Sequence, residues 1–431
     1  MARLWEAQFG VFKCARNRIR EAFPTRFDMA KHQDVFDATA VGIQTSDVRL
    51  TNQRVVLTAV SRNPGSSAAE LSRLTKLAPQ TVSAILQDLD QAGLLAAGDV
   101  IRGKRGQPAT PYSINPTGAY TIGVEIGWRH IEAVLVNIGG GTVANYRRDY
   151  SFPDPRTIFN EIGAVIQQLT ERLPTDQRSK IIALGIASPS GIGRNVDLLE
   201  ADPEMGRLWR SIDMPREVEK ISPLPVQIFN DGNAACWAEL GAHPQPRPAS
   251  FAYVLIGTFI GAGIVAESIL WEGPTGNSAN LGSMLVTDRH GDQNFVHLLA
   301  SIYGLERRLK AAGIVVPPTT PLFWAWDKWE PHVTEWIEDV SRALAKALLN
   351  TAAVIEFNYA IIDGVMPASV LDRIIEGVRL KMAELPTLTF DAPSVAKGHL
   401  GGSAPSVGAA YLPLYRRFFS RDLSHLQDSP A

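Results

Sequence analysis

The chain has 431 residues, a formal net charge of −2 and 45% hydrophobic residues, a balance typical of a soluble globular protein of two or three domains. The small net charge excludes a protein that binds polyanions over its whole surface, so any nucleic-acid surface must be local. The sequence holds two cysteines, Cys14 and Cys236. This number excludes a disulfide framework and fits a reducing compartment.

No export signal or membrane span is predicted. The first residues carry charge without the apolar run that an export signal needs. The most apolar stretch, residues 251–266 (FAYVLIGTFIGAGIVA), is shorter than the roughly 20 residues of a spanning helix. Its glycines and β-branched residues favour two buried strands around a turn. We therefore expect a cytoplasmic protein with no membrane partner.

Residues 1–48 form the first predicted segment. The stretch CARNRIREAFPTRF is basic and is interrupted by Pro24. Two interpretations remain open: a poorly ordered N-terminal arm, or a start codon assigned too early, for which Met29 offers an alternative.

Residues 49–116 combine local positive charge with three short helical patterns. Between Arg49 and Gly106 there are eight basic and four acidic side chains. The first helix has an apolar stripe between Val55 and Val60. The second begins at Ser66 or Ser67 as N-cap, with a glutamate placed to complete a capping box. The third has a proline at its first position, and a glycine ends it. The capping-box glutamate is Glu70, the proline is Pro79 and the glycine is Gly93. The third helix is expected to bury Val82, Ile85, Leu86 and Leu89.

The tight turn before the third helix predicts a helix-turn-helix. In such folds the N-terminal residues of the last helix face the base edges of DNA. Here those residues are Gln80, Thr81 and Ser83, and Gln87 lies one turn further on the same side. Their small or amide side chains can form hydrogen bonds with bases.

Residues 94–115 (LLAAGDVIRGKRGQPATPYSIN) read as two strands around a basic tip, which is the wing of a winged helix. Arg102, Lys104 and Arg105 are placed to meet the DNA backbone or minor groove, and RGQP resembles arms that lie in narrow A·T-rich minor grooves. A polar helix face or a basic turn alone is usually only a solvated surface. The ordered combination predicts a domain that binds double-stranded operator DNA.

From residue 117 onward the pattern becomes α/β, because apolar strands alternate with longer helical patterns. The expected strands lie at residues 120–127, 181–188, 225–229 and 359–364, and the expected helices at residues 157–173 and 335–358.

The motifs of this part, in order, are IGVEIG, GIASPSG, PVQIFNDGNAACWAE, LIGTFIGAGIV, ANLGSM and GAAYLPL. From about residue 51 to 418 the layout resembles the ROK family of transcriptional repressors and sugar kinases. The most specific match is the pair Asn230–Asp231, which closes a strand before a helix of small residues. The resemblance implies a two-lobed actin-like ATPase fold over residues 117–431, with ligand in the cleft. In this family, members with an N-terminal winged helix are sugar-responsive regulators, and members without one are kinases.

By this resemblance Asp231 matches the catalytic base of the kinases. Gly257 and Thr258, with Gly261 and Gly263, match a phosphate-contacting hairpin. The plain structural alternatives are that Asp231 is the N-cap of the following helix and that the glycines form a tight turn between two buried strands.

Three nucleotide contacts of the family are altered here. Its first phosphate loop reads Asp-x-Gly-Gly-Thr, whereas this chain has Glu125 at the Asp position and Trp128 and Arg129 in place of Gly-Thr. Phe259 replaces a glycine of the hairpin, and the adenosine-side Gly-Gly becomes DGVMP at residues 363–367. A tryptophan should block the approach of triphosphate oxygens. We therefore expect no ATP binding, no kinase activity and no cofactor.

The sugar side departs from the family as well. Its Gly-Glu-x-Gly-His motif presents a glutamate to the sugar and a histidine to the sugar and to zinc, but here Asn280 and Ser283 take those places. The cysteine cluster that follows is absent, and His290 and His297 are the remaining candidates. We expect no metal. The expected ligand-binding residues are Asn230, Asp231, Gly257, Thr258, Asn280 and Ser283.

The sequence thus predicts a sequence-specific DNA-binding regulator of carbohydrate-related genes, with repression as the expected outcome. A sugar or sugar derivative is the expected effector, and the expected assembly is a homodimer or a dimer of dimers. Two alternatives remain open: an active sugar kinase with a regulatory head, and a constitutive DNA-binding dimer with a vestigial ligand cleft.

Overall fold

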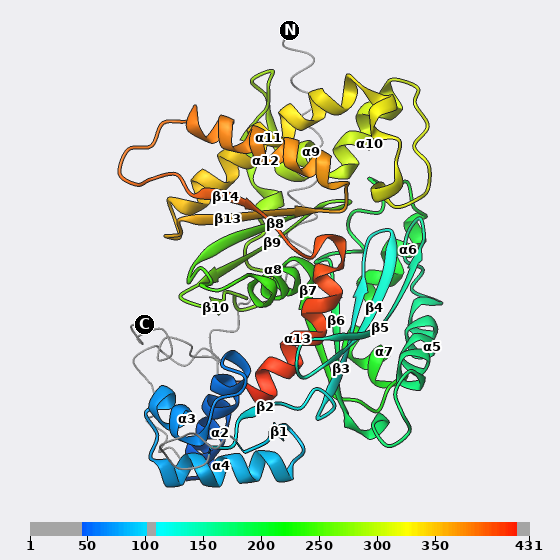
Figure 1. Ribbon diagram of the computed structural model, residues 1–431. Helices are drawn as coiled ribbons and strands as arrows, with labels where there is room; N and C mark the ends of the chain where they lie inside the picture. The colour runs from blue at the N-terminus through cyan, green and yellow to red at the C-terminus, as the bar shows by residue number, and fades with distance from the viewer. Residues whose placement is uncertain (1–44, 101–108, 420–431) are drawn as a thin grey trace, which may run out of the picture. The chain divides into compact units, whose positions relative to one another are not determined.

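The computed structural model describes residues 45–100 and 109–419 (Figure 1). The predicted N-terminal arm falls almost entirely outside these ranges, as do the wing-tip residues Arg102, Lys104 and Arg105. The chain divides into two compact units, residues 1–50 and 51–431. Apart from the start of its first helix, the architecture below belongs to the second unit.

The first part of the fold is the predicted winged helix. Ser67 is the N-cap of its second helix, and the Glu70 carboxylate accepts from the Ser67 N–H at 2.8 Å, which completes the capping box. Pro79 occupies the first turn of the third helix, which buries the four predicted apolar side chains. The elements are α2 (Thr45–Arg62), α3 (Ala68–Thr75), α4 (Pro79–Gln91), β1 (Leu95–Ala97) and β2 (Tyr112–Ile114). The two strands pair antiparallel, so the predicted helices and strand pair are confirmed, while the wing tip lies outside the described residues.

A five-stranded sheet with the order β5-β4-β3-β6-β7 follows. Strands β3, β4 and β5 are antiparallel, whereas β6 and β7 run parallel to β3. Its buried face packs against α5 around Ile122, Val124 and Ile162. The bounds are β3 (Tyr120–Ile126), β4 (His130–Asn137), β5 (Thr142–Asp149), β6 (Ile181–Ser188), β7 (Val226–Asn230), α5 (Ile158–Glu171), α6 (Pro203–Ser211) and α7 (Met214–Glu219).

A second five-stranded sheet repeats this pattern with the order β10-β9-β8-β13-β14. The apolar stretch 251–266 forms the antiparallel pair β8–β9, as predicted, and β13 runs parallel to β8. Figure 1 shows the helices of this lobe stacked on the face of the sheet away from α8. The bounds are β8 (Phe251–Ile256), β9 (Ile260–Ala266), β10 (Ile269–Leu270), β13 (Tyr359–Gly364), β14 (Ser394–Lys397), α9 (Val296–Ala300), α10 (Ile302–Ala311), α11 (His332–Ala352) and α12 (Ala368–Ala383).

Helix α11 is shorter at its C-terminal end than the sequence pattern predicted. It ends at Ala352 rather than near residue 358, and the Ile355 N–H donates to the Thr351 carbonyl at 2.8 Å in the turn that follows. The early end is needed because the chain must reverse before Tyr359 to enter β13, whose residues are almost all buried. Within the described ranges, no helix has both the length and the apolar character needed to cross a membrane.

Helices α8 (Asp231–Ala242) and α13 (Ala404–Phe418) lie between the two sheets (Figure 1). They cross so closely that a Cβ added at Gly408 would lie 1.8 Å from the Ala234 carbonyl oxygen. Asn230, not Asp231, is the N-cap of α8, since its side chain accepts from the Asn233 N–H at 3.1 Å. The N-cap alternative for Asp231 is therefore wrong. This crossing fixes the start of α8, and with it the position of Asp231.

Candidate functional site

The exposed face of α4 carries the residues predicted to read DNA bases. Gln80, Ser83 and Gln87 are exposed and Thr81 is half-buried, while the apolar side chains on the opposite face pack against α2 and α3. The N-cap residue is Ala78, which forms no side-chain hydrogen bond to the first turn. A helix start of this kind is suited to a phosphate group. The structure thus gives the predicted residues the exposure that contact with DNA requires.

A second candidate site is a cavity of about 360 Å³ whose wall comes from both sheets. The end of β3, the end of β5 and the turn between β8 and β9 contribute to it, together with the segment at residues 317–321. Asp231 lies on its wall at the start of α8. The side chains that line it carry both charges and several aromatic rings.

Asp231 is a wall residue whose acidity is strongly perturbed. Its Oδ1 accepts from the Gly232 N–H at 2.8 Å and from the Asn230 side-chain amide at 3.1 Å. Burial, and then the nearby Glu125 carboxylate, raise the pKa of Asp231 from 3.8 to about 7. A carboxyl group with this pKa exchanges a proton near neutral pH, which is the property of a general base.

Two of the bulky departures from the kinase motifs meet inside this cavity. The Trp128 and Phe259 rings pack edge to face with centroids 5.0 Å apart. Trp128 is 8% exposed and Phe259 is 6% exposed. Phe259 also contacts the rings of His297 and Tyr303. Two residues far apart in the sequence therefore fill the same region, where the kinase motifs of the family place glycine.

The basic side chains on the cavity wall are already paired with carboxylates. Arg129, His130 and Arg147 are the basic residues among the lining residues. Their contacts are Arg129–Glu306 at 2.8 Å, His130–Glu125 at 3.2 Å, Arg147–Glu132 at 2.8 Å and Arg147–Asp149 at 3.2 Å. A phosphate group entering the cavity would have to compete with these carboxylates for its cations.

The structure brings only part of the predicted ligand set to this cavity. Asp231, Gly257 and Thr258 line it. Asn230 donates to the Ser190 hydroxyl at 3.1 Å and caps α8, as described above. Asn280 and Ser283 are exposed at the short helix η3 (Leu281–Ser283) and are not among the lining residues.

Other lining residues were not predicted from the sequence. They come from the end of β5, from α10, from the proline-rich segment and from the short helix after it, and no motif marks them. These residues are Arg147, Asp149, Tyr150, Ser151, Glu306, Pro317, Pro318, Thr319, Thr320, Pro321 and Trp324.

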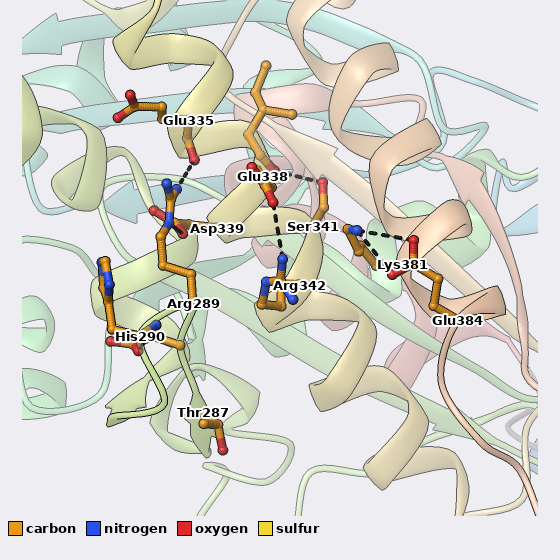
Figure 2. A network of polar contacts seen from close by, with 12 residues as sticks. Thr287, Arg289, His290, Glu335, Glu338, Asp339, Ser341, Arg342, Lys381 and Glu384 are labelled. Atoms are coloured by element: carbon orange, nitrogen blue, oxygen red, sulfur yellow. Dashed lines mark hydrogen bonds and ion pairs between the residues drawn. The ribbon is translucent and has the colours of Figure 1, made fainter.

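Where the ROK kinases hold zinc, this chain has a hairpin fastened by an ion pair. Strands β11 (Leu285–Thr287) and β12 (Gln293–Phe295) form it. Figure 2 shows Arg289 reaching from its turn to α11, where it contacts the Asp339 carboxylate at 2.6 Å and donates to the Glu335 carbonyl at 2.6 Å. This contact ties the turn to the helix through protein groups alone.

The two histidines near the hairpin do not form a zinc-binding set. His290 is exposed at the turn. His297 accepts the Ile260 N–H at its Nδ1, 3.1 Å away, and burial lowers the pKa of His297 to about 4. Structural zinc sites in proteins require four ligands, commonly including cysteine thiolates. The side chains present here therefore do not fit the zinc site of the family.

Comparison with known proteins identifies both parts of the chain. The model of the ROK family matches residues 121–415, and the model of the MarR family matches residues 46–106. The chain belongs to the ROK family. The paired sheets described above are its actin-like ATPase fold, preceded by a MarR-type winged helix.

Both regulators and kinases are among the similar proteins. The xylose repressor of Bacillus subtilis is 24% identical over 239 residues, which are 56% of this chain and 61% of that protein. The crystal structure of a ROK family transcriptional regulator, a homologue of the E. coli MLC protein, covers 89% of this chain and 100% of its own, with a TM-score of 0.66 and 17% identity. A ROK family glucokinase from Streptomyces griseus, solved with glucose and AMPPNP, covers 68% and 99%, with a TM-score of 0.53 and 22% identity. The chain spans about three fifths of the length of the xylose repressors it matches.

Proposed function

We propose that this ROK protein is a DNA-binding transcriptional repressor of carbohydrate-related genes, and that its ROK domain binds a sugar or sugar derivative without phosphorylating it. The observation that carries the proposal is the combination of two features in one chain. A winged helix exposes polar residues on α4, and the adjoining ROK domain has Trp128 and Phe259 packed together in its cavity. A relative named xylose repressor supports a sugar-linked role.

The cavity favours a sugar over ATP for electrostatic and steric reasons. Its basic side chains are paired with carboxylates, one of which, Glu125, lies on the wall itself, and Trp128 and Phe259 fill part of the space. Triphosphate recognition needs unpaired cations, backbone donors and a metal around the phosphates. Neutral hydroxyl groups need only hydrogen-bond partners such as Thr258 and Asp231, both on the wall.

An active sugar kinase with a regulatory head is the second candidate. Asp231 favours it, because a carboxyl group with a pKa of about 7 is suited to accept a proton from a sugar hydroxyl. Assays of ADP release across hexoses and amino sugars separate the two candidates. We expect no ADP release with any of them.

The test of the proposed function is thermal melting of the purified protein against sugars, sugar acids, sugar phosphates and ATP. A ligand at a hundred times its Kd stabilises the native state by about 2.7 kcal/mol. We expect one class of sugar to raise Tm and ATP to have no effect. If no compound shifts Tm, the constitutive DNA-binding dimer with a vestigial cleft replaces the proposal.

We further propose that the protein acts in the cytoplasm as a homodimer or a dimer of dimers on a pseudo-palindromic operator. Two winged helices related by a two-fold axis would read half-sites about one helical turn apart, or a multiple of that spacing. The sugar would change operator affinity only if it binds the DNA-competent and DNA-incompetent states unequally. Footprinting with and without the stabilising sugar tests this link.

Replacing Thr81 by alanine should reduce sequence discrimination more than total affinity. A side chain that reads a base edge contributes about 1–3 kcal/mol of preference for the correct base. We therefore expect Thr81→Ala to lower the ratio of operator to random-DNA affinity several-fold in a binding titration. Thr142→Ala, at an exposed position on β5, is the matched control. Equal losses on operator and random DNA would contradict base reading by Thr81.

Replacing Arg105 by alanine should weaken binding to all DNA sequences alike. Arg105 lies outside the described residues, so this prediction rests on its place in the basic wing. Loss of one phosphate or groove contact lowers the slope of log affinity against log salt by about one. We expect this decrease for Arg105→Ala and none for Arg207→Ala, which alters an exposed arginine of α6. An unchanged slope would remove the wing from the interface.

A further inference from the structure

A buried carboxylate and two histidines come together at the end of α8 that is remote from Asp231. Glu239 is fully buried, the His243 side chain is 11% exposed and the His399 side chain is 42% exposed. One ligating atom from each residue lies within 4.8 Å of the other two. Among the residues that the structure describes, no other group of three or more histidine, cysteine, aspartate or glutamate side chains is placed to hold a metal ion.

The local structure holds the three side chains in place. Glu239 and His243 are four residues apart at the C-terminal end of α8, a spacing that puts both on one face of the helix. The His399 N–H donates to Glu239 Oε2 at 3.0 Å, and its ring Nδ1 lies 2.5 Å from Oε1. The His243 and His399 rings meet edge to face with centroids 5.4 Å apart, and Tyr359 packs against His243 on another side.

One histidine nitrogen in this group is buried and lacks a hydrogen bond. His243 Nδ1 has no hydrogen-bond partner among the described residues, and it lies 3.8 Å from Glu239 Oε1. Buried polar atoms are normally satisfied, so an exception requires an explanation. The Glu239 carboxylate is also fully buried, and the imidazoles that face it supply a positive charge only when they are protonated.

We propose that Glu239, His243 and His399 bind a divalent transition-metal ion of the Zn²⁺ class. Two imidazole nitrogens and one carboxylate oxygen form an established ligand set for Zn²⁺, with water as the fourth ligand. Ligands about 2.0–2.2 Å from a tetrahedral ion lie roughly 3.3 Å from one another. The observed separations of 2.5 Å and 3.8 Å lie on either side of this value, so small side-chain rotations suffice. The exposed edge of His399 gives the ion and its water a route from solvent.

The ion would supply a partner for the His243 ring and a positive charge for the Glu239 carboxylate. This site lies away from the hairpin and uses neither His290 nor His297, and it departs from the expectation of no metal stated above. It would also join the end of α8 to the segment after β14, and Gly402 of that segment lines the cavity described above.

The test is zinc and cobalt binding to the full-length protein after chelator treatment. Cys14→Ser serves as the background throughout, because a free thiol can also bind Zn²⁺. We expect saturable Zn²⁺ binding by calorimetry, a rise in Tm with Zn²⁺, and the intense visible absorption of tetrahedral Co²⁺. His399→Ala and His243→Ala should each weaken Zn²⁺ binding at least about tenfold, since each removes a ligand.

His290→Ala, which alters an exposed histidine, is the matched control and should bind Zn²⁺ as the background protein does. The His399 side chain is partly exposed, whereas that of His243 is buried, so His399→Ala decides the outcome even if His243→Ala does not fold. The proposal is overturned if the background protein shows no saturable Zn²⁺ binding, or if His399→Ala binds with unchanged affinity. The sugar and ATP melting experiment is independent of this result.

Discussion

Gly408→Ala is expected to destabilise the ROK domain by about 3 kcal/mol or more. A Cβ at this position would lie 1.8 Å from the Ala234 carbonyl oxygen and 2.4 Å from its carbonyl carbon. Both atoms belong to the backbone of α8, so no side-chain rotation can relieve the clash. The helices must separate, which would loosen the contacts of α13 with β3 and β6 as well as the start of α8.

Gly241→Ala is the matched control for this effect. Gly241 lies in the same helix pair, but a Cβ there would be 3.7 Å from the Tyr411 ring, an ordinary van der Waals distance. Alanine is favoured over glycine in a helix by about 1 kcal/mol, so this variant should be as stable as the wild type or slightly more stable. Urea unfolding of both variants provides the measurement. Equal midpoints for Gly408→Ala and the wild type would show that the crossing is looser than described.

Asp231→Asn is expected to stabilise the protein at pH 8 and to have little effect at pH 4. The pKa of Asp231 is 3.8 in the unfolded chain and about 7 in the folded protein. Between these values the folded state keeps a proton that the unfolded state has lost, so stability decreases as pH rises through this window. Above pH 7 the full penalty of ionising Asp231 is present.

The size of this penalty follows from the difference between the two pKa values. About three units correspond to about 4 kcal/mol at most, and we expect about 1–3 kcal/mol because Asp231 is partly accessible from the cavity. Asparagine stays neutral at every pH and can still accept the Gly232 N–H. The variant should therefore lose part of the decrease in stability between pH 4 and pH 8.

Urea midpoints at several pH values measure this prediction. Asp391→Asn, at an exposed position, is the control and should follow the wild-type profile. If the urea midpoints of Asp231→Asn depend on pH as those of the wild type do, the Asp231 carboxyl group ionises normally in the folded protein. The same variant tests the sugar site, because it should weaken stabilisation by the effector while leaving operator affinity intact.

The role of Asp231 depends on how the chain enters α8. The sequence identified the end of a strand followed by a helix of small residues, and it offered Asp231 either as a catalytic base or as the N-cap of that helix. The choice depends on which side chain reaches the Asn233 N–H, and the structure assigns it to Asn230. Asp231 thereby lies on the wall of the cavity.

The local structure of this protein can be predicted from the order of its residues. The capping box at Ser67, the proline at the start of α4 and the buried stripe beneath Gln80 each depend on residues a few positions apart. The β8–β9 pair follows in the same way from a short apolar run around a turn. Such features are set by backbone sterics and side-chain spacing, which the order of residues contains directly.

Contacts between residues far apart in the chain follow from the tertiary fold. Trp128 packs on Phe259, Arg129 pairs with Glu306, and His399 contacts Glu239. These pairs meet because the register of the two sheets and the crossing of α8 with α13 bring separate segments together. These contacts depend on strand order and helix packing over the whole domain, and no periodicity in the sequence encodes them. For this reason the helices and strands of the winged helix were predicted closely, whereas most of the cavity wall and the Glu239 cluster were not.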